Sequence, residues 1–362
     1  MLKDSITGLT KEDLTTWMES QGQSTFRTKQ VLEWVWQKRV DDFEQMSNLS
    51  VELRKNLAEN FDFQVLEHVE TQGSEDTTRK ILYKLRDGRY VESVLIPANP
   101  ALFGEKSDRM TLCVSSQVGC AFGCKFCASG LAGFTRNLTA GEIAEQILQT
   151  ELLTGEKINN LVFMGMGEPM ANLDNLLKAI EIITSDWGLK IGARRLTIST
   201  SGVVPGIRRL ADFPKQVRLA ISLHGASNET RSKIMPVNKK WQVDELFDAL
   251  KYWNANKKQR VTLEYILIQG VNDHLEEARL LAKRAKGLNA KVNLIPYNTV
   301  EGLEWVRPSE THCRRFEKEV INHGAFTTLR MEKGHDIDAA CGQLRLKKET
   351  SEGLIELAPA KK

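Results

Sequence analysis

Three cysteines within eight residues are the groups in this sequence best suited to chemistry. They lie in the segment Cys120-Ala-Phe-Gly-Cys124-Lys-Phe-Cys127, which has the spacing Cys-x3-Cys-x2-Cys. One loop with this spacing can ligate three irons of a four-iron, four-sulfur cluster, written [4Fe-4S]. Protein-bound clusters of this kind normally take four cysteine thiolates. The loop therefore leaves one iron open to a ligand that the protein does not supply.

A structural zinc site is the alternative for closely spaced cysteines. Such a site would use a Cys-x2-Cys pair together with a second pair, or with histidines further on. The other cysteines, Cys113, Cys313 and Cys341, are scattered singly, and the nearest histidines lie far along the chain. The spacing therefore favours an iron–sulfur cluster over zinc.

Size and composition limit the class of protein. A chain of 362 residues, 41% of them hydrophobic, can bury a large core with one main domain and a small second one. Six cysteines are too few for a disulfide scaffold, and the first residues lack the apolar core of a signal peptide, so we expect a cytoplasmic protein. No apolar run approaches the roughly 20 residues that cross a bilayer. A net charge of +3 is too weak to indicate nucleic-acid binding by itself.

The pattern from Thr10 to about Asn60 predicts helices, which we assign to an accessory domain at residues 1–65. A small helical domain ahead of a catalytic one often binds substrate or acts as a lid. Four basic side chains could contact RNA or form a solvated helix face: Arg27, Lys29, Lys38 and Arg39.

Strand patterns follow these helices. Two alternating segments around Asp87-Gly88 predict a β-hairpin within a linker at residues 66–105. Beyond it, short apolar strands alternate with amphipathic helices, which predicts an α/β fold with a parallel sheet or barrel at residues 106–346 and a charged tail at 347–362. Six parallel strands are expected, at residues 111–115, 161–164, 196–200, 219–223, 263–268 and 292–295. A complete eightfold barrel would need eight.

Polar residues stand at the ends of these strands, where parallel α/β folds bind their ligands. A glycine-rich turn of this kind is common, and a single buried histidine is more often a satisfied core residue. The four segments together predict a ligand site: Gly165-Met-Gly167-Glu168-Pro169, Ser199-Thr-Ser-Gly202, Ser222-Leu223-His224 and Pro296-Tyr-Asn298.

The cysteine loop resembles that of the radical S-adenosylmethionine (SAM) enzymes. In those enzymes the amino and carboxylate groups of SAM occupy the open iron, and an aromatic residue precedes the last cysteine, as Phe126 does here. Nearly the whole chain is similar to the RlmN/Cfr family of RNA methyltransferases. The most similar segments are Ser115–Cys120, Ile221–His224, Val292–Pro296 and Asp336–Leu344.

This resemblance implies a fold and a set of SAM ligands. The fold is the open, partial (βα)6 barrel of radical SAM enzymes, here with a small N-terminal helical domain and a β-hairpin linker. The implied SAM-binding residues are Gly167, Glu168, Ser199, Ser222, Leu223, His224 and Asn298.

The chemistry of the family explains two further cysteines. Carbon 2 of adenine is electron-poor and cannot attack the methyl group of SAM, so a radical route is required. By resemblance, two SAM molecules are used per turnover: one methylates Cys341, and the other yields an adenosyl radical that takes a hydrogen from the S-methyl group. The methylene radical adds to the adenine ring. Cys113 then releases the product through a transient disulfide with Cys341, and Glu92 accepts the ring proton.

Considered singly, these residues have simpler explanations. Cys113 could be a small core hydrophobe, Cys341 an inert buried thiol, and Cys313 is expected to be structural. Glu92 differs, because the strand from Tyr90 to Ile96 is apolar on both faces and an ionised carboxylate is costly to bury there without a partner or a purpose.

The resemblance also implies the substrate. RlmN-type enzymes methylate carbon 2 of one adenosine in the peptidyl-transferase region of 23S rRNA and can act on an adenosine in the tRNA anticodon loop, whereas Cfr-type enzymes methylate carbon 8 of the same rRNA base. Pro169 after Glu168 resembles the RlmN pattern. The segment Met331–His335 departs from the family by carrying less arginine. The expected partners are 23S rRNA, tRNA and an electron donor such as a flavodoxin. We expect no binding to DNA or to a membrane, and we expect the protein to be a monomer.

Two other classes of function remain open at this point. A non-catalytic iron–sulfur protein, for RNA binding or electron transfer, would supply four protein ligands and would not need Cys341. A radical SAM enzyme acting on a protein or a small molecule would lack the pair of Cys113 and Cys341.

Overall fold

The structure, a computed structural model, describes most of the chain. The residues described are 3–63, 65–75, 77–98, 108–131, 133–298, 303–330 and 342–355. Cys341 and the segment Met331–His335 lie outside them.

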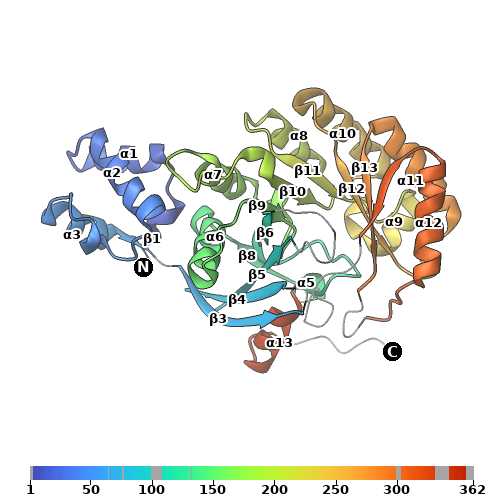
Figure 1. Cartoon of the computed structure of the whole chain (residues 1–362), viewed down its shortest axis with the longest axis horizontal. Helices are drawn as coiled ribbons and strands as arrows, with labels where there is room; N and C mark the ends of the chain where they lie inside the picture. The colour runs from blue at the N-terminus through green and yellow to red at the C-terminus, as the bar shows by residue number, and fades with distance from the viewer. Residues whose placement is uncertain are drawn as a thin grey trace.

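A ten-stranded sheet forms the core and carries the site (Figure 1). Its spatial order is β14-β13-β12-β11-β10-β9-β6-β5-β4-β3. The strands from β6 to β14 pair in parallel, and β3 to β6 pair antiparallel. The bounds are β3 (Leu66–Gly73), β4 (Arg79–Leu85), β5 (Tyr90–Pro97), β6 (Met110–Cys113), β9 (Asn160–Phe163), β10 (Leu196–Thr200), β11 (Arg218–Ser222), β12 (Thr262–Leu267), β13 (Lys291–Pro296) and β14 (Phe326–Leu329).

The six expected parallel strands are all present, and the structure adds a seventh. Strand β14 was missed because its four residues, Phe-Thr-Thr-Leu, are too short and too polar to form an apolar run. The predicted hairpin is also confirmed, but it is not a detached connection. Its strand β5 pairs with β6, with Val94 opposite Cys113, so the hairpin extends the sheet of the core.

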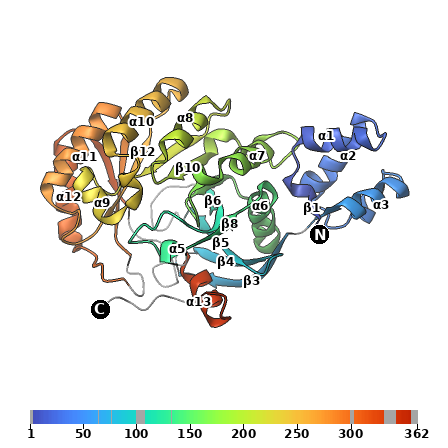
Figure 2. The same ribbon diagram turned by 180° about the vertical axis from the view of Figure 1, so that it is seen from behind.

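Helices cover one face of the curved sheet, as Figures 1 and 2 show. On β12 the side chains of Leu263, Tyr265 and Leu267 are completely buried toward these helices, and the ring of Tyr265 stacks on Phe316 of the helix at residues 310–322, with centroids 5.6 Å apart. The alternate residues of each strand therefore face the other, concave side. The covering helices are α6 (Ala140–Thr154), α7 (Leu173–Thr184), α8 (Val204–Asp212), α10 (Val243–Lys257), α11 (Leu275–Leu288) and α12 (Glu310–Asn322), with the shorter α9 (Asn228–Ile234) beside them.

The N-terminal helices form a separate module that is tied to α6. Its elements are β1 (Asp4–Ser5), α1 (Lys11–Ser20), α2 (Thr25–Glu33), α3 (Val51–Asn60) and β2 (Phe61–Asp62). The carboxylate of Glu145 on α6 accepts hydrogen bonds from the hydroxyl of Thr7 and from the backbone N–H groups of Val65 and Leu66. Burial raises the pKa of Glu145 to about 7. A single buried carboxylate thus joins the module and the following strand to the core.

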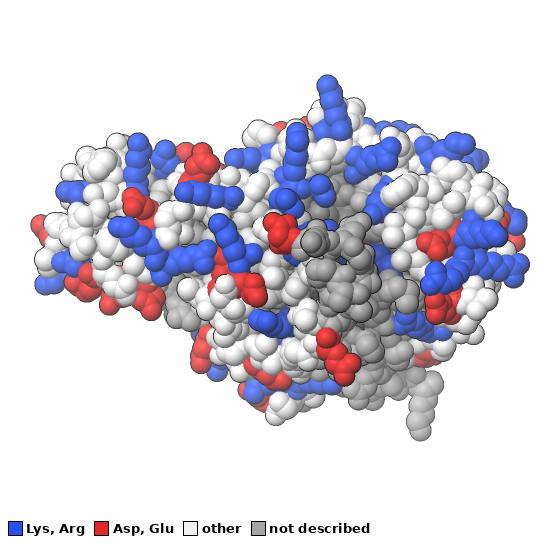
Figure 3. All heavy atoms as spheres, in the orientation of Figure 1, with Lys and Arg blue, Asp and Glu red and all other residues white. Residues whose placement is uncertain are grey.

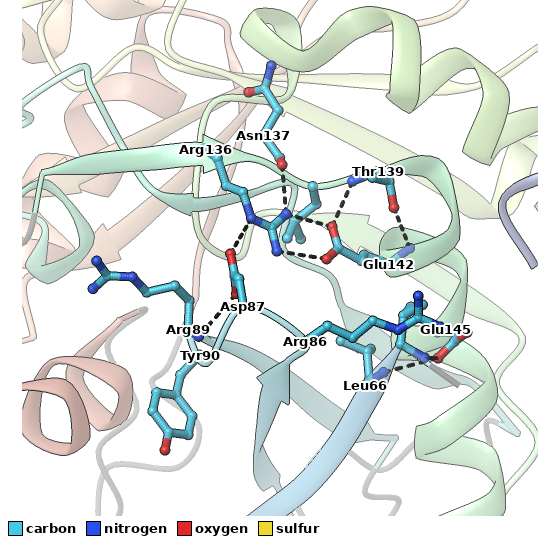
Figure 4. A network of polar contacts seen from close by, with 12 residues as sticks. Leu66, Arg86, Asp87, Arg89, Tyr90, Arg136, Asn137, Thr139, Glu142 and Glu145 are labelled. Carbon is cyan, nitrogen blue, oxygen red and sulfur yellow. Dashed lines mark hydrogen bonds and ion pairs between the residues drawn. The ribbon is translucent and has the colours of Figure 1, made fainter. Parts of the chain in front are cut away.

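The hairpin turn is also fixed to the core, through the polar network in Figure 4. Arg136, on β8 (Phe134–Asn137), donates to Asp87 in the turn at 2.5 Å and makes two bonds of 2.8 Å with Glu142. Glu142 and Thr139 form a capping box at the start of α6. The turn, β8 and the helix therefore hold one another in place.

None of the described helices is both long and apolar enough to span a membrane.

Candidate active site

The cysteine loop lies between β7 (Gln117–Gly119) and α5 (Ala128–Leu131), after the end of β6. Its entrance depends on Gly119, which has a φ of +76°, and a Cβ there would lie 1.9 Å from the carbonyl oxygen of Gly133. Inside the loop, the N–H of Cys127 donates to the carbonyl of Cys124 at 3.1 Å. The loop is thus wound so that all three cysteines line one cavity of about 360 Å³.

Most of the predicted SAM ligands line the same cavity. They come from the ends of β9, β10, β11 and β13, and they are Gly167, Glu168, Ser199, Ser222, His224 and Asn298. The carboxyl ends of parallel strands meet at one edge of a sheet, which explains why residues from distant parts of the chain converge here.

Leu223 is the exception among the predicted ligands. Its side chain is completely buried in the hydrophobic core and does not line the cavity, because it alternates with Ser222 and His224 along the chain. Its N–H donates to the carbonyl of Glu264, and its carbonyl accepts from Arg231 at 3.1 Å. Both backbone groups are therefore already engaged inside the protein.

The glycine-rich turn after β9 is shaped by packing against its own chain. A Cβ on Gly167, whose φ is +97°, would lie 2.5 Å from the Cβ of Gln117. A Cβ on Gly165 would lie 2.8 Å from the Oγ of Ser115 and from the backbone of Val114. The two glycines thus let the turn approach the strand that leads to the cysteine loop.

Glu168 presents a buried carboxylate to the cavity. It accepts hydrogen bonds from the N–H of Ser201 at 2.7 Å and from the N–H of Met170 at 3.0 Å. Burial raises its pKa above the usual range. A cationic ligand such as an ammonium group would offset this desolvation and favour the ionised form.

His224 connects the ends of the strands to the cysteine loop. Its Nδ1 accepts a hydrogen bond from the N–H of Ile266 at 3.0 Å, which puts the ring proton on Nε2. Its ring meets Phe126 edge to face, with centroids 4.8 Å apart. Burial, together with the nearby Arg231, lowers the pKa of His224 to about 3, so the ring is neutral at physiological pH.

The thiols and the open polar atoms of the cavity fit a cluster and a polar organic ligand. Burial raises the pKa of Cys120 to about 12 and also raises that of Cys124, so these thiols ionise only when a cation stabilises them, as a metal cluster does. Among the described residues, no three His, Cys, Asp or Glu side chains could together hold a single metal ion. The buried oxygens of the cavity that have no hydrogen-bond partner within the described part of the chain include Glu264 Oε2 and Asn298 Oδ1.

Glu92 and Cys113 lie on the concave face, beyond the cavity. In the register of the sheet, Cys113 is beside Val162 of β9, and Val162 is beside Thr197 of β10, two residues before Ser199. On the other side Cys113 is opposite Val94, two residues from Glu92, so Glu92 and Cys113 share this face as diagonal neighbours, roughly 7–8 Å apart. Cys113 does not itself line the cavity.

The carboxylate of Glu92 is held at the start of the C-terminal helix α13 (Gln343–Ser351). It accepts hydrogen bonds from the N–H of Gly342 at 2.9 Å and from the N–H of Arg345 at 2.6 Å, and it pairs with the ammonium of Lys80 at 3.0 Å. Cys341 lies outside the described residues, but Gly342 follows it directly in the sequence.

Gly342 also packs against the end of the cysteine loop. Its φ is +89°, and a Cβ there would lie 2.4 Å from the Oγ of Ser129, which is two residues after Cys127 and lines the cavity. The residue that follows Cys341 is thus in contact with both the loop and Glu92.

Three charged residues in or around the site were not predicted from the sequence. Arg231 is buried, and its guanidinium donates to the carbonyls of Ser201 and Leu223 and to Asn238, so it holds the ends of β10 and β11 together. Glu264 lines the cavity from β12, and Lys80 pairs with Glu92 from β4. The available signal was the charge of Glu264 within an otherwise apolar strand, whereas Lys80 is one of three basic residues on β4 and does not stand out in the sequence.

The basic residues of the N-terminal module have different surroundings. Arg39 pairs with Glu151 of α6, which is buried, and so it joins the module to the core. Lys38 lies over the ring of Trp34. Lys29 lines a second cavity, of about 840 Å³, between the module and the core, together with Lys11, Lys190 and Lys215.

Cys313 is buried on α12, away from the cavity, with its Sγ 3.8 Å from the carbonyl of Pro308. This position is consistent with the structural role expected for it.

Two family models match the chain. Residues 114–282 match the Radical SAM superfamily. Residues 5–62 match the ribosomal RNA large subunit methyltransferase N-terminal domain.

Curated relatives match over nearly the full length. A protein of Akkermansia muciniphila, named "Probable dual-specificity RNA methyltransferase RlmN", is 60% identical over 344 residues, which are 95% of this chain and 96% of that protein. A protein of Opitutus terrae, named "Probable dual-specificity RNA methyltransferase RlmN 3", is 50% identical over 366 residues, covering 98% of each. The crystal structure of a radical SAM methyltransferase from Sphaerobacter thermophilus is similar with a TM-score of 0.87 and 39% identity, covering 94% of this chain and 98% of that one.

Proposed function

The chain belongs to the RlmN family of radical SAM RNA methyltransferases, and on this premise we propose that it methylates carbon 2 of an adenosine in the peptidyl-transferase region of 23S rRNA. We further propose that an adenosine in the tRNA anticodon loop is a second substrate, which the words "dual-specificity" in the names of its relatives support. The observation that carries the proposal is the contact of Gly342 with both Ser129 and Glu92.

Membership of the radical SAM superfamily implies a [4Fe-4S] cluster and SAM. Cys120, Cys124 and Cys127 would hold the cluster, and the glycine-rich turn with Glu168 would receive the ammonium group of SAM. When bound, the two cofactors supply the methyl group and the radical that activates it. His224 and Phe126 pack together between the strand ends and the loop, and so they orient the loop.

Cys341, Cys113 and Glu92 would complete the transfer to RNA. In this proposal Cys341 carries the methyl group on its sulfur, using one SAM for this step and a second for activation, and it becomes joined through that carbon to the adenine. As the ring regains its aromaticity, Glu92 accepts the ring proton, and the one unpaired electron left on the ring passes to a one-electron acceptor, which the bound cluster would supply. The thiolate of Cys113 then attacks the sulfur of Cys341, an S–S bond forms and the S–CH2 bond breaks, and the electron pair of that bond takes a proton to give the methyl group.

The choice of carbon 2 over carbon 8 rests on two observations. Pro169 follows Glu168 as in the RlmN pattern, and the relatives that match over nearly the whole chain are named RlmN. Methylation at carbon 8, as in Cfr-type enzymes, is the alternative that product analysis distinguishes.

RNA contact is proposed for the N-terminal module and the adjoining core. On the face shown in Figure 3, Lys and Arg side chains are spread over both parts and are interspersed with acidic ones. The lysines between the module and the core, including Lys29, are suitable partners for phosphates. An electron donor such as a flavodoxin would supply the electrons that reduce the cluster.

The test is anaerobic turnover of the reconstituted enzyme with SAM, a reductant and either rRNA or tRNA fragments, followed by mass spectrometry of the nucleosides. We expect 2-methyladenosine from both RNAs, whereas 8-methyladenosine would place the protein with the Cfr-type enzymes. The Cys113→Ala variant should accumulate a covalent protein–RNA adduct. Cys313→Ala is the matched control, because it removes another buried cysteine outside the site, and it should turn over normally. Clean turnover by Cys113→Ala would exclude Cys113 from the mechanism.

A further inference from the structure

Lys80 is a buried ammonium at a position where the fold does not require a charge. It lies within β4, its side chain is 0% exposed, and it is opposite Val94 in the register. The neighbouring Leu82 and Tyr90 on this face belong to a small apolar cluster with Leu344 of α13. Burying an ammonium among such groups is unfavourable unless it is paired. Its ion pair with Glu92 therefore calls for a functional explanation.

Lys80 differs in charge from the other groups that donate to the Glu92 carboxylate. The backbone N–H groups of Gly342 and Arg345, which also donate to this carboxylate, are neutral. The guanidinium of Arg345 lies 2.7 Å from Glu349 instead. Other titratable groups of the described chain lie on this face or on the part of α13 that covers it: Glu67, Glu70, Lys84, Tyr90, Cys113, Glu349 and Glu352. Lys80 thus places a full positive charge in direct contact with Glu92.

A carboxylate that is to accept a proton must be ionised beforehand. Burial favours the neutral acid, and an opposite charge within about 4–6 Å favours the ionised form. The ammonium of Lys80, at 3.0 Å from the carboxylate of Glu92, is an opposite charge well within this range. The contact at 3.0 Å also fixes the direction of the carboxylate toward α13, where the segment that contains Cys341 ends.

We propose that Lys80 is a positioning residue for Glu92: its ammonium keeps the carboxylate ionised and oriented until the proton of the adenine ring is transferred to it. This inference rests on the proposed role of Glu92 as the base. After the transfer, the proton is on the carboxyl oxygen, and the ammonium is unchanged.

The test measures how fast the covalent adduct is resolved, as a function of pH, in single turnovers of the reconstituted enzyme with an rRNA fragment. Four proteins are compared: the unaltered enzyme, Lys80→Met, Glu92→Gln and the double variant. Iron content and methylation of Cys341 are recorded for each, because a structural role would lower these as well. Since the Cys113 thiol also titrates, only the differences between profiles are interpreted.

Lys80→Met should load its cluster and form the adduct, but it should resolve the adduct at least about tenfold more slowly at neutral pH. Its profile of resolution rate against pH should be shifted upward by about one pH unit or more. Lys80→Arg, which restores a cation, should move the profile back. In the Glu92→Gln background, Lys80→Met should cause no further slowing. If Lys80→Met does not fold, Lys80→Gln, which keeps a donor without the charge, should show the same shift.

Two results are separable. If Glu92→Gln resolves the adduct at the normal rate, the proposed base is wrong, and with it the premise. If Glu92→Gln stalls but the profile of Lys80→Met is unshifted, or if Lys80→Met slows both backgrounds equally, the role of Lys80 is overturned while the base stands.

Discussion

Gly342→Ala should detach the start of α13 from the site while leaving the cysteine loop able to hold its cluster. The added methyl group would lie 2.4 Å from Ser129 Oγ and 2.9 Å from the Ser129 backbone nitrogen, closer than van der Waals contact allows. The backbone at this position has a φ of +89°, which residues other than glycine rarely adopt. Two hydrogen bonds to the Glu92 carboxylate depend on the same backbone position.

The magnitude can be worked from these contacts. The left-handed conformation costs about 1–2 kcal/mol for a residue with a Cβ. Loss of a hydrogen bond to a charged group adds about 1.5–3 kcal/mol. The sum, about 2.5–5 kcal/mol, corresponds to a fall of roughly 60- to 4,000-fold in the ratio of attached to detached α13, because each 1.4 kcal/mol is a factor of ten.

Gly353→Ala is the matched control. Gly353 follows the same helix and has a φ of +69°, but a Cβ there would meet no atom within 4 Å. The Gly353→Ala variant has the same backbone strain but no clash. It should therefore destabilise the end of α13 by about 1–2 kcal/mol and leave the hydrogen bonds to Glu92 unchanged.

Amide hydrogen exchange of α13, read by mass spectrometry beside adduct formation, is the assay. For Gly342→Ala we expect faster exchange in α13 and a fall in adduct formation of similar size, with iron content retained. Normal exchange and adduct formation in Gly342→Ala would refute the claim that the contact of Gly342 with Ser129 and Glu92 holds the start of α13 in place. Equal effects in both variants would attribute the loss to backbone strain alone.

Two further predictions concern the supports of the site. The pKa of Glu145 is about 7 in the folded protein and about 4.5 in the unfolded chain, so the folded state keeps the proton to higher pH. The free energy of unfolding should therefore fall by roughly 3 kcal/mol from pH 4.5 to pH 7. Glu145→Gln, whose amide can still form hydrogen bonds with Thr7 and Val65, should remove that part of the decline when denaturant unfolding is measured at a series of pH values. Arg231→Lys keeps the charge but cannot make the three hydrogen bonds of the guanidinium. It should therefore lower the free energy of unfolding by about 2–4 kcal/mol and weaken SAM binding measured by calorimetry. Unchanged values of both would show that the ends of β10 and β11 keep their positions without the guanidinium.

The sequence predicted the parts of the site that depend on short patterns. The cysteine loop is one contiguous segment, and residues such as Ser199 and His224 follow apolar strands that are recognisable by themselves. Their convergence on one cavity then follows from the parallel sheet, whose strands all end at the same edge. Leu223 shows the limit of a short motif, because alternation along the chain turns its side chain into the core.

The parts that were missed depend on contacts between distant segments. The bond from Arg345 to Glu92 joins residues 253 positions apart, and no local pattern indicates it. Arg231 was equally hard to find, because a helix that carries an arginine normally exposes it to solvent. The pairing of β5 with β6, which makes the hairpin part of the core sheet, is likewise a matter of register rather than of composition.

This register also explains how one face can serve two stages of the proposed reaction. The parallel half of the sheet presents the cysteine loop, Glu168 and His224 around the cavity, while the antiparallel half presents Glu92 beside Cys113. If the hairpin were a flexible linker, Glu92 would have no fixed position relative to Cys113 and the cysteine loop. Because β5 is hydrogen-bonded to β6 and the turn is held by Arg136, the residues proposed for both stages share one rigid surface.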